Sequence, residues 1–360
     1  MSDLGSKDIL IFSDPNVAST QIHTQIENVL RENDIRFEIF TDIEPDPSAT
    51  TVEKAYKIWR VSQPSALLAI GGGSTIDVAK AVGILATNGG RIHDYEGIDK
   101  FSIPPLPLVA IPTTAGTGSE VSGSCVITDT ERDIKMSIRH ARLNPARVAI
   151  LDPFVLTTLP ATVAAHAGMD AFVHAFESYL SLQASPLTDG INLYAIELIS
   201  KHIRSFVANR ANFESGGSML SAAALAGISF GLTGLGNVHC MARFVGAFFH
   251  VPHGLSNAVC LPYVSEFNSS ACPEKFSRVA QAMGIDTGQL TVTEAAQAAV
   301  SAMKSLCDDI GIPRNLREIG VKEEAIPKMA QLAFKADYNR WNPRYTTEED
   351  FVKLFRTAMG

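Results

Sequence analysis

The sequence predicts two domains, an α/β domain built on a parallel sheet followed by an all-helical domain. The chain has 360 residues, and a typical domain has roughly 150. Its first part alternates short apolar runs with amphipathic stretches, which is typical of a parallel sheet covered by helices. After Asp152-Pro153 the pattern changes to long helical repeats rich in alanine and leucine. We therefore place the boundary near residue 157, with domains at 1–157 and 158–360.

The elements of the first domain follow in order. Short apolar runs predict buried strands, and the amphipathic runs between them predict helices. We expect helices at 19–32 and 48–62, and strands at 8–12, 37–40, 66–70, 108–111, 121–129 and 148–151.

The second domain shows helical periodicity almost throughout. Residues 215–242 contain no Asp, Glu, Lys or Arg, and this stretch is longer than the roughly 20 residues of a membrane span. It carries six glycines and His239 and lacks a flanking basic cluster, so we interpret it as a buried helix and a tight turn. The other predicted helices are 161–182, 190–208, 218–230, 293–309 and 323–334.

The composition narrows the class of partner. Thirty basic and thirty-eight acidic residues give a net charge of −8, and no basic block is present. An electrostatic grip on nucleic acid or an anionic membrane is therefore not expected. The five cysteines show no CxxC spacing and the start shows no signal pattern, which predicts reduced thiols in a cytoplasmic protein.

A glycine-rich turn follows the strand at 66–70. Gly71-Gly-Gly-Ser74 opens a helix, where free backbone N–H groups accept a pyrophosphate. A second loop, at 112–120, follows the strand at 108–111 and carries threonine hydroxyls. Because the carboxyl ends of neighbouring parallel strands meet at one edge, the two loops together predict a nucleotide site rather than coincidental turns. Asp14, just past the first strand, is either a ribose acceptor that favours NAD over NADP or an exposed turn acid.

Four side chains of the second domain form a candidate metal site. Asp170 and His174 are four apart in an apolar helix and so share one face. His239 and His253 lie in charge-poor segments, and Pro252 suits a helix start with His253 in the first turn. One carboxylate and three imidazoles suit a divalent metal and leave room for a substrate oxygen.

Each of these histidines could instead be a hydrogen-bonded core residue. Roles are also expected for three further histidines. His250 is a second candidate, as a ligand or proton relay. We expect His166 to be structural and His140, in a basic turn, to be solvated.

Six motifs in order resemble the iron-containing, or group III, alcohol dehydrogenase family: GGGSTIDVAKA, AIPTTAGTGSEVS, LDPFVLTTLP, GMDAFVHAFESYLS, VPHGLSNAVCLPYV and NPRYTTEED. They span nearly the whole chain. The resemblance implies a dehydroquinate synthase-like architecture, with an N-terminal dinucleotide-binding α/β domain and an all-α metal-binding domain. It also implies a homodimer or larger assembly.

The resemblance assigns residues by position. The metal ligands would be Asp170, His174, His239 and His253, holding Fe²⁺. Zn²⁺ binds such sites more tightly than iron, and Zn²⁺ or another divalent metal is the alternative. The resemblance implies NAD(P) as the cofactor, and of the two, Asp14 favours NAD. Its contacts would be Asp14, Gly72, Gly73, Ser74, Asp77, Thr113, Thr114, Thr117, Ser124, Lys135 and Leu156.

One position departs from the family pattern. Many members carry a second histidine four residues after the ligand matching His239, and here that residue is Arg243. Arginine is permanently protonated and cannot be a base, but it forms bidentate contacts with carboxylate, phosphate or sulfonate. We hypothesise that Arg243 orients an anionic group on a small substrate. It could instead extend into solvent or pair with a carboxylate such as Glu177, and the proton would leave through the cofactor ribose, water or His250.

The sequence therefore predicts a metal-dependent, NAD-linked alcohol dehydrogenase or aldehyde reductase. Alternatives are a glycerol-type or polyol-phosphate dehydrogenase, and a dehydroquinate synthase-like lyase. The lyase is the weaker match, because it needs several basic residues and the helical segments offer chiefly Arg243. The complete ligand set disfavours a scaffold that has lost activity.

Overall fold

The computed structural model describes residues 1, 4–132 and 134–360. The chain forms two compact units. The first comprises Met1–Thr114 and Gly118–Thr158, and the second comprises Ala115–Thr117 and Leu159–Gly360. The first is an α/β unit and the second is helical, so the predicted fold class is confirmed.

The first unit is built on a five-stranded parallel sheet with the order β2-β1-β3-β5-β8. Its strands are β1 (Asp8–Ser13), β2 (Arg36–Phe40), β3 (Ala66–Gly71), β5 (Leu108–Pro112) and β8 (Val148–Ala149). The chain moves from β1 to β2 on one side and then crosses to β3 on the other. The edge beyond the carboxyl ends of β1 and β3 is therefore the topological switch point, where ligands of such sheets bind.

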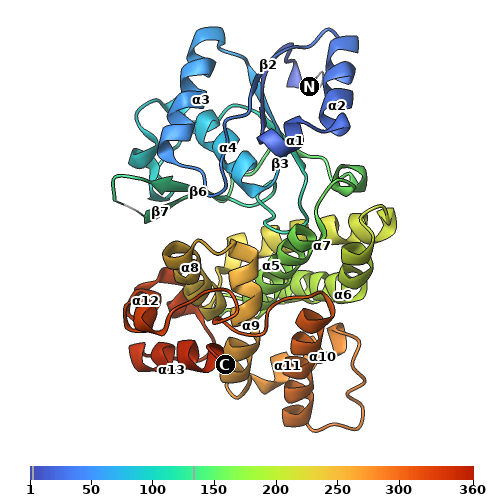
Figure 1. Ribbon diagram of the computed structural model, residues 1–360. Helices are drawn as coiled ribbons and strands as arrows, with labels where there is room; N and C mark the ends of the chain where they lie inside the picture. Colours follow the sequence, from blue (N-terminus) through green and yellow to red (C-terminus); the bar gives the residue numbers. More distant parts are fainter. Residues whose placement is uncertain (2–3, 133) are drawn as a thin grey trace. The chain divides into compact units, whose positions relative to one another are not determined.

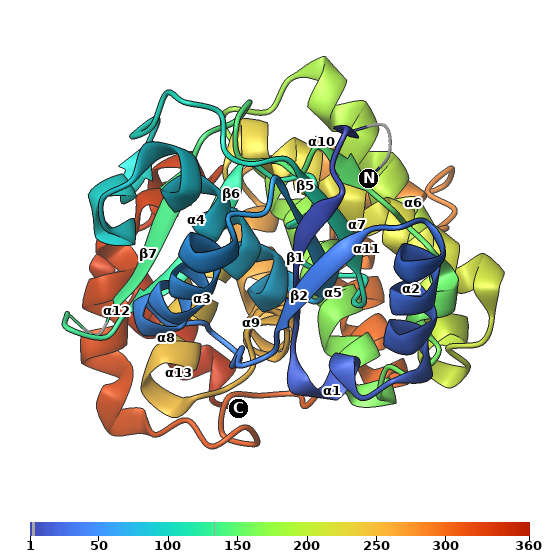
Figure 2. The same ribbon diagram turned by 90° about the horizontal axis from the view of Figure 1, so that it is seen from above.

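Helices cover both faces of this sheet. Alternate strand residues such as Leu10 and Leu67 pack on α3 (Ala49–Ser62) and α4 (Gly73–Asn88). The opposite face meets α2 (Gln21–Glu32), which follows the short α1 (Pro15–Ala18). Figure 2 shows β1 and β2 with α2 on one side and α3 on the other.

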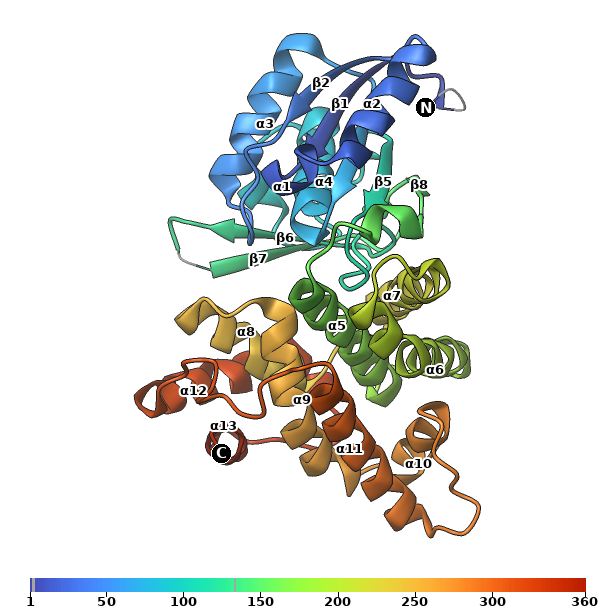
Figure 3. The ribbon, with the colours of Figure 1, turned by 45° about the vertical axis from the view of Figure 1, so that its right-hand side comes forward.

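A second, three-stranded sheet lies in the same unit. It has the order β4-β7-β6, with β4 at Gly97–Ile98, β6 at Ser124–Asp129 and β7 at Ile134–Arg139. The strand predicted at 121–129 begins three residues later and pairs antiparallel with β7, outside the parallel sheet (Figure 3). Strand β7 was not predicted, although its alternating Ile-Lys-Met-Ser-Ile-Arg is the pattern of a half-buried antiparallel strand.

The second unit is helical. Its central helix α5 (Ala161–Leu180) is buried along most of its length and packs against α6, α7 and α9, and Figure 1 shows α5, α6 and α7 side by side. Each predicted helix of this unit is found, shifted by a few residues at its ends. The other helices are α6 (Pro186–Ala208), α7 (Phe213–Thr233), α8 (Asn237–Phe249), α9 (His253–Ser269), α10 (Pro273–Ala282), α11 (Val292–Asp309), α12 (Ile326–Lys335) and α13 (Glu348–Ala358).

Helix α7 is, by length and composition, able to cross a membrane. However, 56% of its apolar window is buried inside the protein, against α5 and α6. A turn at residues 234–236 separates it from α8. The uncharged stretch is thus a packed helix and a tight turn, as predicted.

Candidate metal centre and nucleotide-binding edge

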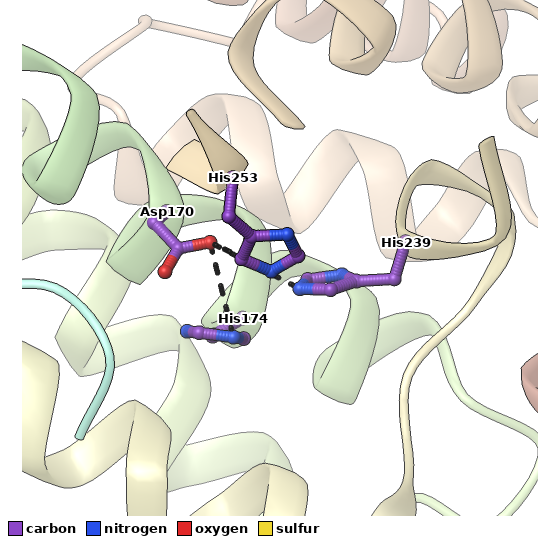
Figure 4. A group of neighbouring side chains, drawn as sticks. All are labelled: Asp170, His174, His239 and His253. Carbon is purple, nitrogen blue, oxygen red and sulfur yellow. Dashed lines mark ion pairs between the residues drawn. The ribbon is translucent and has the colours of Figure 1, made fainter. Parts of the chain in front are cut away.

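The four predicted metal ligands come together in the helical unit. One ligand atom from each of Asp170, His174, His239 and His253 lies within 4.8 Å of the others. The Nε2 atoms of the three histidines lie 3.9, 4.0 and 3.8 Å from Asp170 Oδ1. Figure 4 shows the four side chains pointing toward one another, and they belong to α5, α8 and α9.

The local sequence explains this convergence. Asp170 and His174 share one face of α5, and His239 lies in the first turn of α8. Pro252 precedes α9, so His253 is its first residue, as predicted. Gly254 allows the start of α9 to lie directly on α5, because a Cβ there would be 2.8 Å from the carbonyl carbon of His166.

Burial and charge set the protonation of the ligands. Asp170 is buried, which disfavours its charged form, but the three histidines and Asn257 outweigh this and lower the pKa of its carboxyl. Burial, followed by the charges of His174 and His253, takes the pKa of His239 well below its ordinary value. An ionised carboxylate beside a neutral imidazole is the state that binds a metal.

The donor set fits a divalent transition metal. A tetrahedral site with bonds of about 2.1 Å separates its ligand atoms by roughly 3.4 Å. The separations of 3.8–4.0 Å from Asp170 Oδ1 are about 0.4–0.6 Å longer than this value, and all four ligand atoms lie within 4.8 Å of one another, so small side-chain movements would bring them to bonding distance. His253 is 41% exposed while the other three ligands are buried, so the site is accessible on the His253 side.

Asn257 is a site residue that sequence reasoning missed. Its Nδ2 donates to Asp170 Oδ1 at 2.7 Å and lies 3.1 and 3.2 Å from Nε2 of His239 and His253. The amide therefore holds the Asp170 carboxylate in place. The available signal was its spacing of four residues from His253, which puts both on one face of α9.

Aromatic rings surround the ligands. His174 stacks on Phe230 with a centroid distance of 4.6 Å, and Tyr338 lies 6.3 Å from His239. The ring of Trp341 lies 5.9 Å from that of Tyr338, with the two planes tilted by 36°. Aromatic rings therefore flank two of the four candidate ligands, His174 and His239.

The two predicted catalytic residues lie on α8. Arg243 is half-buried one turn after His239, with its guanidinium 6.0 Å from the Phe244 ring centre. His250 ends the helix with a left-handed φ of 54° and an exposed side chain. The structure supplies no test of their predicted roles, which stay predictions.

The structure also shows the environments of His166 and His140. His166 lies near the start of α5 and is half-buried, and burial lowers its pKa. The expectation that His140 is solvated is wrong. Its ring is buried 5.1 Å from that of Phe101, and its Nδ1 accepts the N–H of Leu143, so packing has withdrawn it from water.

The predicted nucleotide loops of the first unit meet at the switch point. Asp14 follows β1 and its Oδ1 accepts two backbone N–H groups of α1. Gly72 caps α4 without a side-chain hydrogen bond, as an anion-binding turn requires. Thr113 donates its N–H to Gly71, and a Cβ on Gly72 would touch Thr114 at 3.4 Å, so the two loops are in contact.

The other predicted cofactor residues occupy varied environments. Asp77 accepts the Ser119 hydroxyl and the N–H of Val126, and burial raises the pKa of its carboxyl. Lys135 pairs with Asp46 at 2.6 Å. Ser124 begins β6, Leu156 is fully buried, and Ser74 lies in the first turn of α4 beside Gly73. Thr117 belongs to the helical unit. Cofactor contact by each of them stays a prediction.

Lys80, a buried residue of the helix that follows the glycine turn, was not predicted from the sequence either. Lys80 of α4 donates to the backbone carbonyls of Ser122 and Ser124, at 2.9 and 2.8 Å. Burial lowers the pKa of its ammonium group, and the carboxylates of Asp77 and Glu120 oppose this. Lys80 therefore attaches the loop after β5 to the helix that opens with the glycine turn.

Comparison with known proteins decides the family. The model of iron-containing alcohol dehydrogenases matches residues 1–153, and the C-terminal model of the Fe-containing alcohol dehydrogenase family matches residues 164–359. The chain belongs to the iron-containing alcohol dehydrogenase family. The similarity to the relatives described next covers almost the whole length of both chains.

A 1,3-propanediol dehydrogenase of Klebsiella pneumoniae is 40% identical, over 99% of this chain and 92% of its own. An NAD-dependent methanol dehydrogenase of Bacillus methanolicus is 37% identical, over 100% of this chain and 94% of its own. A crystal structure of a 1,3-propanediol oxidoreductase superimposes with a TM-score of 0.97 at 39% identity, covering 99% of this chain and 93% of that one. The resemblance carried by the six motifs is thus confirmed, and with it the expected class, oxidoreductases acting on CH–OH groups.

Proposed function

We propose that the protein is a metal-dependent, NAD-linked alcohol dehydrogenase that interconverts small alcohols and aldehydes. The observation that carries this proposal is the cluster of Asp170, His174, His239 and His253, with its ligand atoms within 4.8 Å of one another. Two relatives are named for methanol and 1,3-propanediol, and these names support a small substrate. The family name supports Fe²⁺, and Zn²⁺ is the competing metal for such a donor set.

The helical unit would hold the metal. When bound, the metal supplies Lewis-acid polarisation of a substrate oxygen. Asp170 and the three histidines provide its ligands, with one negative charge, so a divalent ion keeps a net charge of +1. Asn257 donates to the Asp170 carboxylate at 2.7 Å, and the rings of Phe230 and Tyr338 flank His174 and His239.

The α/β unit would bind NAD at the switch point. The open backbone N–H groups at the start of α4, from Gly72 to Ser74, suit the pyrophosphate. Asp14 has a second carboxylate oxygen beyond the one that caps α1, and we propose that it accepts an adenosine ribose hydroxyl. Thr113 and Thr114 would line the nucleotide from the neighbouring loop.

Metal-dependent turnover tests the proposal. The metal-stripped protein is given Fe²⁺ without air, or Zn²⁺, and NADH oxidation is followed with short aldehydes. His253→Ala should lose metal-dependent turnover, whereas His202→Ala, which removes a buried histidine of α6 outside the cluster, should keep it. Full activity of His253→Ala without metal would refute the assignment.

We further propose that Arg243 orients an anionic group of the substrate, as its position one turn after His239 supports. Arg243→His should lower kcat/KM for a carboxylated aldehyde by about 10-fold to 100-fold, the cost of one hydrogen bond to a charged group, and change neutral aldehydes less. An unchanged preference contradicts the idea. The same screen, with glycerol and polyol phosphates added, separates the alternative dehydrogenases.

His250 is proposed as the proton relay, because it is exposed at the end of α8, three residues before His253. His250→Asn should lower kcat more than it changes KM. We also propose a cytoplasmic location, which the unpaired cysteines support, and a homodimer or larger assembly, which sedimentation would measure.

A further inference from the structure

Glu177 is a third polar residue on the ligand-bearing face of α5. It follows Asp170 by seven residues and His174 by three, a spacing that aligns all three side chains on one side of the helix. Its side chain is 3% exposed, and its nearest polar neighbours belong to α8. A buried carboxylate needs hydrogen-bond donors, and α8 supplies them.

The contacts of Glu177 define the orientation of His239. Glu177 Oε2 lies 2.6 Å from His239 Nδ1, and Oε1 accepts the N–H of Val238 at 2.6 Å. The N–H of His239 also points to Oε2, at 3.4 Å. Burial raises the pKa of the Glu177 carboxyl to about 7, and the backbone N–H groups of Gly236, Val238 and His239 oppose this by donating to it. When Glu177 is ionised its oxygens only accept, and Nδ1 of His239 is then the donor. A neutral ring with its proton on Nδ1 keeps its lone pair on Nε2, the atom that faces the other three ligands.

The same carboxylate also caps the start of α8. The cap residue Gly236 has no side chain to offer the first-turn N–H groups, and a Cβ there would lie 2.9 Å from Glu177 Oε1. Glu177 of α5 therefore accepts the first-turn N–H groups of α8 that a side chain at the cap position would ordinarily accept. Its negative charge suits the positive end of the α8 dipole. One side chain thus fixes the first turn of α8 and the ring that this turn carries.

We propose that Glu177 is a positioning residue, which holds the His239 ring and its Nδ1 proton so that Nε2 is ready to bind the metal. His174 provides the contrast, since its buried Nδ1 has no hydrogen-bond partner among the described residues. This inference rests on the proposed function, because it concerns the same metal site. Removal of comparable partners of metal-bound histidines weakens metal binding by about 10-fold to 100-fold.

The test is Co²⁺ affinity, measured by the visible spectrum of the bound ion and by calorimetry on the metal-stripped full chain. Glu177→Gln keeps the shape of the side chain but has one acceptor oxygen for two donors. Its NH₂ group must therefore face either the N–H of Val238 or the Nδ1 proton of His239, where donor meets donor. We expect its Kd for Co²⁺ to rise by about 10-fold to 100-fold.

Asn342→Ala is the matched control, because Asn342 Oδ1 accepts the N–H of Asn237 in the same turn of α8. It should lower the melting temperature and leave the Co²⁺ Kd within about threefold of wild type. Equal losses of affinity in both variants would mean that Glu177 is only a cap, and an unchanged affinity in Glu177→Gln would also overturn the inference.

A second measurement uses the wild-type protein and therefore does not depend on whether the Glu177 variant folds. Histidine ¹⁵N NMR of the wild-type apoprotein, with the His239 signals assigned by their loss in His239→Gln, should show the proton on Nδ1. A proton on Nε2 would overturn the inference. If the wild type itself binds no Co²⁺, the proposed metal site fails, and this inference fails with it.

Discussion

Gly254→Ala should weaken metal binding although it changes no ligand. The added Cβ would overlap the carbonyl oxygen of His166 and lie 2.8 Å from its carbonyl carbon. Carbon atoms in ordinary contact are 3.5–4.0 Å apart, so the start of α9 must move away from α5 by about 1 Å. Because His253 is the neighbouring residue, its ring moves with the backbone.

The size of this displacement sets the expected effect. Metal–ligand distances tolerate only about 0.2 Å, so a shift of about 1 Å removes most of the contribution of His253. We expect the Kd for Co²⁺ to rise by about 10-fold to 100-fold. The overlap should also cost about 1–3 kcal/mol in the free energy of unfolding. Calorimetric Co²⁺ titration and urea unfolding measure the two effects separately.

Gly190→Ala is the matched control. Gly190 is exposed in α6, and a Cβ there meets nothing within 4 Å. Alanine should add about 0.5–1 kcal/mol of stability from helix propensity and leave metal binding unchanged. If Gly254→Ala binds Co²⁺ as tightly as wild type and Gly190→Ala, the reasoning from backbone contact is wrong.

Further predictions concern the α/β unit. Lys80→Met leaves Asp77 without its buried cation and should cost about 3–5 kcal/mol in the free energy of urea unfolding. Lys54→Met, at an exposed ion pair, should leave the unfolding midpoint almost unchanged, and equal effects of the two variants would contradict the role of burial. A hydrogen bond from Arg132 lowers the pKa of Asp129 to about 2, so its stabilising contribution is present above pH 4 and is lost as pH falls towards 2. Asp129→Asn should therefore destabilise the protein at pH 7 and less at pH 3, and an equal loss at both pH values would refute this.

Local patterns in the sequence were sufficient for much of the site. Asp170 and His174 are adjacent because helix geometry places residues four apart on one face, and Pro252 predicts the helix that begins at His253. The strand before the glycine turn is likewise a local apolar run. These features depend on neighbours in the chain, so composition and spacing reveal them.

Other features depend on segments that are distant in the chain. The carboxylate of Glu177 on α5 meets a ring 62 residues later, and the Asn257 amide meets Asp170 87 residues earlier. His140 is buried because Phe101 packs on it, and the strand at 124–129 leaves the parallel sheet because β7 pairs with it. Helices α10 and α13 were not predicted either. The sequence by itself thus indicated the four candidate metal ligands and the family, whereas only the tertiary structure decided which distant side chains contact them, because contacts between distant segments leave no periodic signal in the chain.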